Sequence, residues 1–236
     1  MDAVGPVIEF AKQAKAGQFI FVSSAGMYKT SDEVPFLEGD KVKEDAGHAV
    51  VEAALAKGSM QWASFRPQYL TGYGSNKDCE EWFFDRIARG RAVPIPGSGV
   101  QLTVVAHAED IAAMIALGIA KPDVAHGKVF NAVTTRAVTL DGFARMCAKA
   151  AGMSDKLKVV HYDPKKADVD VKKAFPFRPV HFYSEPRNAV TLLGWAPKWR
   201  LEDALAERWA FYQKSGRATK EKAGQFDLDD KALASL

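Results

Sequence analysis

The chain has 236 residues, of which 47% are hydrophobic and 26% are charged, and its formal net charge is +3. This is the profile of a soluble globular protein with one sizeable core or two modest ones. The small net charge neither requires nor excludes a nucleic-acid partner, because a local patch of charge matters more than the sum. The longest apolar run, 111–120, is interrupted by Gly118 and is too short to span a bilayer.

The two cysteines, Cys79 and Cys147, form no spaced pair that suggests a metal site, and they fit a reducing compartment better than a disulfide framework. Residues 1–5 resemble neither a secretory signal nor an arginine-rich transit peptide. We therefore expect no targeting segment within this sequence, and the composition alone does not give a cellular destination.

Helices and strands alternate along the chain, which predicts an α/β fold. Apolar spacing and the glycines and prolines that follow it set the expected boundaries. The predicted helices are 7–15, 46–57, 79–89, 109–120, 139–151, 185–193 and 201–212, and the predicted strands are 19–22, 62–67, 102–105, 129–131 and 158–161, with a short strand and tight turn over 93–99. The tail after Ser215 is highly charged and is expected to lie on the surface.

The strand over 19–22 is the segment around which the rest of the chain is organised. Four β-favouring apolar residues predict a strand buried on both faces inside a parallel sheet. Ligands of such sheets bind at the carboxyl ends of the strands, so the hydroxyls of Ser24 and Tyr28 are the first candidates for a site. The alternative is a strand followed by an ordinary serine turn.

Five segments, in this order, resemble the extended short-chain dehydrogenase/reductase family, which includes nucleotide-sugar epimerases and dehydratases. They are SSAGMY at 23–28, FRPQYLTGYG at 65–74, RGRAVPIPGSGVQLTVVAHAEDIA at 89–112, VFNAV at 129–133 and LLGWAP at 192–197. The resemblance implies one NAD(P)-epimerase/dehydratase-like unit over 1–236. Within it, 1–75 would be the C-terminal part of a Rossmann-like sheet, 76–236 mainly a small α+β substrate-type lobe with returns to the sheet, and 215–236 the charged tail.

The sequence departs from that family at the dinucleotide site. Binding a dinucleotide requires a glycine-rich turn after the first strand, and no strand-linked G-x-G-x-x-G is present here. The opening helix matches one that the family places after four strands, so the N-terminal glycine-fingerprint strands are absent. We expect a fragment of a longer chain, because half of a parallel sheet would expose a hydrogen-bonding edge. NAD(P) is expected as a cofactor if that N-terminal part is present.

The family's proton-transfer residues are also altered. Its reaction uses a tyrosine, a lysine four residues later and a serine or threonine that orients the substrate. Ser24 matches the family's serine. When the helix over 46–57 is matched to the family by the glutamate Glu52, Glu44 stands at the tyrosine position and His48 at the lysine position. Hydride-coupled proton transfer by the ordinary route is therefore not expected. The same resemblance implies that Ser23, Tyr28, Arg66, Pro67 and Gln68 line the cofactor crevice.

Longer strings resemble a narrower group, the chloroplast stem-loop-binding protein family, a plastid branch of the same superfamily. They include DAGHAVVE at 45–52, NKDCEEWFFDRIARGRAVPIPGSG at 76–99, KKAFPFRPVHFYSEPR at 172–187 and FDLDDKAL at 226–233, and the GHAVVE helix is more similar to the b-type form than to the a-type. The resemblance implies a chloroplast location, RNA binding and homo- or hetero-oligomers with the a-type form. It also implies contact with the plastid ribosome or RNA polymerase.

The segment 156–187 can be analysed for RNA binding from its residues alone. It holds eight Lys or Arg against four Asp or Glu, with aromatic side chains between them. Cations neutralise phosphates and aromatic faces stack on unpaired bases, at about 1–3 kcal/mol per base. The candidate RNA-binding residues are Lys165, Lys166, Lys172, Lys173, Phe175, Phe177, Arg178 and His181. The alternative is that the phenylalanines close a satellite core while the lysines are solvated.

Carboxylates gather at the start of the helix over 79–89, where Asp78, Glu80, Glu81 and Asp85 are close in sequence. They are able to hold Mg²⁺, although charges that favour the helix dipole are the more common explanation, and no metal ligand is assigned. Three functions remain open: an RNA-binding plastid protein with weak or no endoribonuclease activity, an active nucleotide-sugar epimerase or dehydratase, and a scaffold subunit of a plastid complex.

Overall fold

The computed structural model describes residues 4–74, 79–220 and 222–236, which form two compact units. The first unit runs to Gln68 and takes in Glu109–Thr135 and Tyr183–Lys198. The second unit comprises Tyr69–Ala108, Arg136–Phe182 and Trp199–Leu236. The first boundary falls after Gln68, ahead of the expected position at 75, and two later segments return to the first unit.

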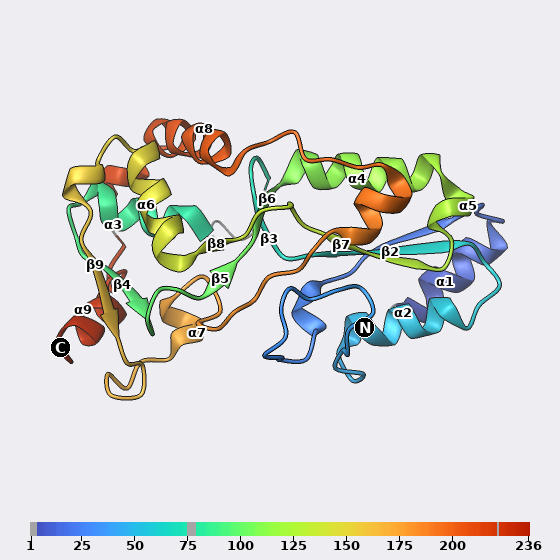
Figure 1. Cartoon of the computed structure of the whole chain (residues 1–236), viewed down its shortest axis with the longest axis horizontal. Helices are drawn as coiled ribbons and strands as arrows, with labels where there is room; N and C mark the ends of the chain where they lie inside the picture. The colour runs from blue at the N-terminus through green and yellow to red at the C-terminus, as the bar shows by residue number, and fades with distance from the viewer. Residues whose placement is uncertain (1–3, 75–78, 221) are drawn as a thin grey trace. The chain divides into compact units, whose positions relative to one another are not determined.

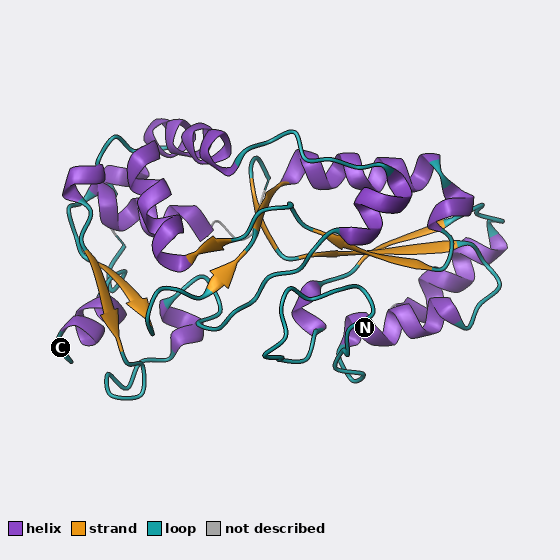
Figure 2. Cartoon of the chain, in the orientation of Figure 1, coloured by secondary structure: helices purple, strands orange, loops and turns teal. Residues whose placement is uncertain are grey.

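The first unit is built on a parallel sheet with the order β1-β2-β7 (Figures 1 and 2). The strands are β1 (Phe19–Val22), β2 (Trp62–Pro67) and β7 (Lys128–Ala132). Parallel neighbours require a crossover, which α2 (Gly47–Ala56) supplies between β1 and β2. This arrangement confirms the predicted α/β class and brings the carboxyl ends of all three strands to one edge of the sheet.

Helices cover both faces of this sheet, with α1 (Val4–Gln13) and α2 on one side and α4 (Ala108–Ala120) on the other (Figure 1). On the first face, Trp62 of β2 packs with Ile8, Val51 and Leu55 of the two helices. Since side chains alternate along a strand, Phe65 points to the opposite face, toward α4. The short α5 (Pro122–Ala125) and a π-helical turn, η3 (Ala189–Leu193), complete the unit.

The prediction that β1 is buried on both faces is wrong. Its first three residues are partly buried, and Val22 is 55% exposed. The reason is that β1 is an edge strand among the described strands, with β2 as its hydrogen-bonded neighbour. An apolar run of this kind predicts a strand correctly but does not say how many of its sides are covered.

The second unit has a helical core and three pairs of short strands. The helices are α3 (Cys79–Ala88), α6 (Leu140–Ala150), α8 (Leu201–Lys214), α7 (Val171–Ala174) and α9 (Asp227–Leu233). The strand pairs are β3 (Tyr69–Thr71) with β6 (Val105–His107), β4 (Val93–Pro96) with β9 (Val159–Tyr162), and β5 (Leu102–Thr103) with β8 (Val138–Thr139). The strand expected over 102–105 is thus divided between β5 and β6. Among the described residues, no helix has both the length and the apolar composition of a membrane span.

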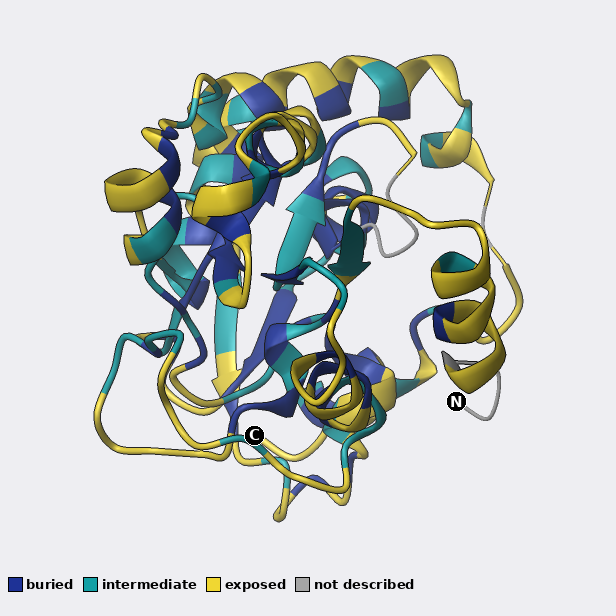
Figure 3. Ribbon diagram, turned by 90° about the vertical axis from the view of Figure 1, so that its right-hand side faces the viewer, coloured by how far each residue is buried: buried dark blue, intermediate teal, exposed yellow. Residues whose placement is uncertain are grey.

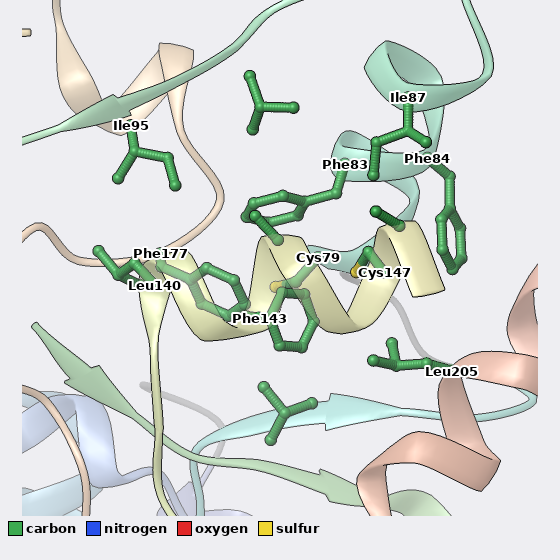
Figure 4. Close-up of a cluster of buried hydrophobic side chains, with 14 of the residues drawn as sticks. Cys79, Phe83, Phe84, Ile87, Ile95, Leu140, Phe143, Cys147, Phe177 and Leu205 are labelled. Atoms are coloured by element: carbon green, nitrogen blue, oxygen red, sulfur yellow. The ribbon is translucent and has the colours of Figure 1, made fainter. Parts of the chain in front are cut away.

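Aromatic rings fill the core of this unit (Figure 4). The ring centroid of Phe143 on α6 lies 5.1 Å from that of Phe83 on α3 and 5.0 Å from that of Phe177, both in edge-on arrangements. Cys79 and Cys147 are buried in the same cluster as free thiols, and burial raises the pKa of Cys147 well above its usual value. Buried residues lie on the inward faces of the helices and strands, and exposed residues lie on their outward faces and in loops (Figure 3).

The C-terminal segment is more deeply integrated than its composition suggests. Phe226, Asp229 and Ala232 are buried, so the prediction of a surface tail is wrong for these residues. The carboxylate of Asp229 lies 2.8 Å from the guanidinium of Arg86 on α3, and both side chains are almost fully shielded from solvent. A buried guanidinium requires a partner of opposite charge, and the tail provides it.

We predict that Gly118→Ala destabilises the first unit. A Cβ on Gly118 of α4 would lie 2.6 Å from Cζ of Phe65, whose ring is fully buried and stacked on Phe130. Overpacking of this kind costs about 1–3 kcal/mol, which exceeds the gain of about 1 kcal/mol from replacing a helical glycine. Urea unfolding measures the change in unfolding free energy.

Gly5→Ala is the matched control, because Gly5 is also helical and nothing lies within 4 Å of its added Cβ. This variant should be neutral or slightly stabilised. Equal stability of the two variants would contradict the close packing of α4 on Phe65.

Candidate functional site

A buried polar network lies at the carboxyl ends of β1, β2 and β7 in the first unit. The Tyr28 hydroxyl donates to Oδ1 of Asn131 at 2.7 Å and accepts from Nη1 of Arg66 at 2.8 Å. Arg66 and Asn131 are paired neighbours on β2 and β7, which explains how one phenol reaches both. The three residues are at most 5% exposed, so the network belongs to the interior of the unit.

The guanidinium of Arg66 is fully engaged within this network. Its Nε and Nη2 donate to the two carboxylate oxygens of Glu52 on α2, at 3.1 and 2.6 Å, in a bidentate pair. Its Nη1 also donates to the backbone carbonyl of Glu38 at 3.2 Å. Ser64 donates to the same Glu52 carboxylate at 2.6 Å. The arrangement therefore ties β2 to α2 and to the loop after β1.

The electrostatics of the network keep Tyr28 neutral. Burial raises the pKa of Tyr28 to about 12, and the nearby charge of Arg66 offsets part of this rise. Burial disfavours the charge of Arg66, yet the hydrogen bonds and charge of Glu52 prevail and raise the pKa of Arg66. A phenol held neutral in this way does not act as a base near neutral pH.

The expected catalytic residues are not brought together by the described contacts. The Ser24 hydroxyl accepts a hydrogen bond from the backbone amide of Gly26 at 3.0 Å, capping the short 3-10 helix η1 (Ala25–Met27). Glu44 is exposed, and His48 is half-buried with its ring 6.1 Å from that of Phe21. Within the described residues, no hydrogen bond or ion pair joins Ser24, Glu44 and His48.

The residues expected to line a cofactor crevice divide into two groups. Tyr28 and Arg66 direct their polar atoms into the network, so they do not fit the role of cofactor ligands here. Ser23 is buried with its hydroxyl 4.0 Å from the sulfur of Met27. Pro67 and Gln68 are half-buried at the end of β2, where Gln68 accepts a hydrogen bond from Ser184 at 3.3 Å.

Three network residues were missed in the sequence analysis, Ser64, Asn131 and Glu38. Asn131 is fully buried, and its amide nitrogen donates to the carbonyls of Phe36 and Glu185 at 3.0 and 3.1 Å. The signal was present, because an asparagine inside the apolar strand VFNAV needs buried partners. Glu38 accepts from the backbone amides of Asn131 and Asn188 at 3.3 and 3.1 Å, and nothing in its surrounding sequence marks this role.

The expected RNA-binding residues also divide. Lys165, Lys166, Lys172 and Lys173 are exposed, as phosphate contacts must be. In contrast, Phe175 and Phe177 are buried in the aromatic core of the second unit, where their faces are covered by other rings, so the stacking role expected of them needs correction.

Two further residues of this segment are held by local contacts. The Arg178 guanidinium lies 3.9 Å from the ring centroid of Phe182, a cation–π contact. The Nδ1 of the exposed His181 accepts from the backbone amide of Leu102 at 3.1 Å. The structural alternative therefore accounts for the phenylalanines, whereas the four lysines are exposed.

The carboxylates at the start of α3 are neutralised by arginines. Glu80 and Glu81 accept from Arg208 at 3.0 and 2.9 Å, and Asp85 accepts from Arg217 at 2.8 Å. Asp78 lies outside the described residues. No group of three or more His, Cys, Asp or Glu within the described part of the chain is arranged to hold a metal ion. Carboxylates paired in this way do not fit a Mg²⁺ site.

Residues 3–132 match the model of the NAD dependent epimerase/dehydratase family. The chain is 36% identical over 236 residues to the chloroplast stem-loop binding protein of 41 kDa b from Arabidopsis thaliana, covering 99% of this chain and 61% of that protein. It is 23% identical to an uncharacterized protein of Sinorhizobium fredii, over 88% of this chain and 56% of the relative.

Solved structures with the same fold are longer as well. An epimerase from Methanothermobacter thermautotrophicus superimposes with a TM-score of 0.72 at 17% identity, covering 92% of this chain and 66% of that one. A UDP-glucose 4-epimerase from Thermotoga maritima gives 0.70 at 21% identity, over 90% of this chain and 68% of the other. These similarities support the Rossmann-like fold, and the chain spans less than two thirds of the length of the curated relatives it matches.

We predict that Tyr28→Phe lowers the unfolding free energy by about 1–3 kcal/mol, because it leaves buried groups of Arg66 and Asn131 short of one partner each. Urea unfolding provides the measurement. Tyr73→Phe is the control, since Tyr73 is 76% exposed and should lose nothing. A Tyr28→Phe protein as stable as the wild type would show that the network does not support the fold.

We also predict that the protein loses stability as the pH rises from about 10 to 12. The folded state raises the pKa of Tyr28 above its ordinary value of 10.0, so over this range the unfolded chain releases a proton that the folded chain retains. Unfolding free energies at stepped pH values test this, and the loss should be smaller in Tyr28→Phe. A tyrosinate absorbance difference between the folded wild type and Tyr28→Phe that reaches half of its full value near pH 10 would contradict it.

Proposed function

The chain belongs to the NAD dependent epimerase/dehydratase family, and from that premise we propose that it uses the family's fold to bind RNA in the plastid. The observation that carries the proposal is its similarity, along 99% of its length, to an Arabidopsis protein named for chloroplast stem-loop binding. Exposed lysines of the second unit support it, since RNA affinity depends on cations that reach the phosphates.

The geometry of the first unit favours this function over ordinary redox catalysis. At the family's proton-transfer positions, Glu44 is exposed and His48 lies beside Phe21, with no described contact to Ser24. The polar atoms of Tyr28 and Arg66 form hydrogen bonds within the interior network, so these two side chains are unsuited to holding NAD(P). We therefore derive no hydride-transfer step for this chain.

The similarity to the chloroplast protein also supports proposals for the location, the partners and the nuclease activity of this protein. We propose a location in the plastid stroma and homo- or hetero-oligomers with the a-type member of the family. The plastid ribosome or RNA polymerase would be the larger assembly that the protein joins. We propose weak or no metal-dependent endoribonuclease activity, which is supported by the pairing of the α3 carboxylates with arginines.

Two other functions have an observation in their favour. A nucleotide-sugar epimerase or dehydratase is favoured by the fold and by Ser24, which follows the carboxyl end of β1. A scaffold subunit is favoured by the exposed apolar side chains of Val7, Phe10 and Val50, which suit a protein partner. The scaffold is compatible with RNA binding, whereas the enzyme predicts conversion of nucleotide sugars with NAD(P) bound.

We predict that the full protein binds a stem-loop RNA with an affinity that falls as salt rises. The logarithm of the association constant should fall linearly with the logarithm of salt concentration, with a slope of about −0.7 to −0.9 per phosphate contacted. Fluorescence anisotropy with labelled RNA measures it. Absence of binding at low salt would refute the proposed function.

The control addresses the enzyme alternative with the same preparation. Conversion of nucleotide sugars to other sugar products in the presence of NAD(P) should stay at background, and Ser24→Ala should leave RNA affinity unchanged, because the Ser24 hydroxyl caps η1 rather than facing a lysine surface. Turnover that depends on Ser24 would favour the epimerase or dehydratase instead.

A further inference from the structure

A hollow of about 800 Å³ lies within the second unit, bounded by α3, α7, the end of α8 and the segment that leads to α9. It is lined by five cationic side chains and three carboxylates among the described residues. Its lining comes from three stretches that are far apart along the chain, so a hollow here was not expected from the sequence. The distribution of charge between its floor and its rim decides what it is able to bind.

The charges on the floor of the hollow are paired with one another. Its carboxylates belong to Glu81, Asp85 and Asp229, and each is at most 5% exposed. Arg217 forms ion pairs with both Glu81 and Asp85, and Asp229 pairs with Arg86 at 2.8 Å. Because each buried carboxylate has a guanidinium against it, the floor contributes little net negative field to an approaching ligand.

The rim carries the unbalanced charge. Lys173 at the end of α7 and Lys220 and Lys222 after η4 (Arg217–Thr219) are exposed and line the opening. Lys173 lies 4.0 Å from Asp170, and both side chains are largely solvated, so this pair is weak. Lysines spaced around a hollow are suited to contacting the phosphates of a strand that passes over it.

The hollow also has an aromatic edge. Phe211 of α8 lines the hollow and is half-buried, and the ring of Tyr73 lies edge-on to it with centroids 5.2 Å apart. Tyr73 is the most exposed of the large hydrophobic side chains in the described residues, at 76%. An exposed ring beside cations is the arrangement on which an unpaired base stacks while its backbone is held.

We propose that this hollow is a binding groove for single-stranded RNA, in which Lys173, Lys220 and Lys222 hold the phosphates and a base stacks on Tyr73. The inference rests on the proposed function and deepens it, because it assigns the RNA to a surface that the sequence did not single out except at Lys173. An acidic peptide would use the same lysines but gains less from an exposed aromatic ring.

The charge test replaces the three rim lysines in the full protein, as K173Q/K220Q/K222Q. The probe is a labelled single-stranded oligouridylate of about ten nucleotides, within the range that such grooves hold. Losing three phosphate contacts should reduce the magnitude of the salt slope by about 2, since each contact on a single strand contributes about 0.7. K173R/K220R/K222R should keep the slope, because the charge is retained.

The matched control is K57Q/K128Q/K149Q, which removes the same charge from exposed lysines that do not line the hollow. It should leave the slope close to that of the wild type. Tyr73→Leu should weaken binding about fivefold or more without changing the slope, because stacking involves no counterion release. Melting temperatures confirm that each variant is folded.

The outcomes separate the groove from the function. If the wild type binds and the rim variant keeps the wild-type slope, the groove is wrong while RNA binding stands. If the wild type binds no RNA, both fall. If an oligoglutamate competes as well as the oligouridylate and is lost in the same variant, the groove is a site for acidic peptides and the inference is overturned.

Discussion

The bidentate ion pair between Glu52 and Arg66 is the interaction on which the first unit depends. It joins α2 to the central strand β2, and the third nitrogen of the same guanidinium reaches Tyr28 and the loop carbonyl of Glu38. Both charges are buried, so removing either would leave the other uncompensated, at a cost of about 3–5 kcal/mol. The pair therefore fixes the carboxyl ends of the strands, the part of the fold where the family's site would be built.

The second unit applies the same constraint on a larger scale. Carboxylates on the buried side of α3 face Arg208 of α8 and Arg217 of η4, while Arg86 of α3 faces Asp229 of α9. Each pair joins segments that are more than 120 residues apart in the sequence. Charged side chains thus hold the C-terminal segment against α3, which explains why a segment of such polar composition is packed rather than free.

The sequence was sufficient for the α/β class and for most elements, because apolar periodicity and glycine punctuation are local. It failed where the outcome depends on a distant partner. The burial of Asp229 depends on Arg86, 143 residues earlier, and composition alone marked that segment as solvated. Tyr28 and Arg66 were identified as site residues, yet only the structure shows that their polar atoms are spent on each other and on Glu52 and Asn131. Phe175 and Phe177 lie near cations in the sequence, as stacking residues would, but both side chains are buried in the aromatic core.

The separation of charges into buried ion pairs and exposed lysines explains how a chain with a small net charge can carry cationic side chains on its surface. Glu80, Glu81 and Asp85 of α3 are buried and share ion pairs with Arg208 and Arg217, so much of their charge is cancelled within the fold. The ion pairs of exposed lysines, such as Lys12 with Glu9 and Lys231 with Asp168, are solvated and weak, so exposed lysines contribute to the field that a ligand meets. The net charge of +3 sums the buried ion pairs and the exposed lysines, so it reveals neither group. Because the buried pairs stabilise the fold while the exposed lysines contribute little to it, surface charge can change with a new ligand without disturbing the scaffold. The network that holds the strands together does not include Glu44 or His48, so this part of the fold does not depend on the two residues expected at the family's proton-transfer positions.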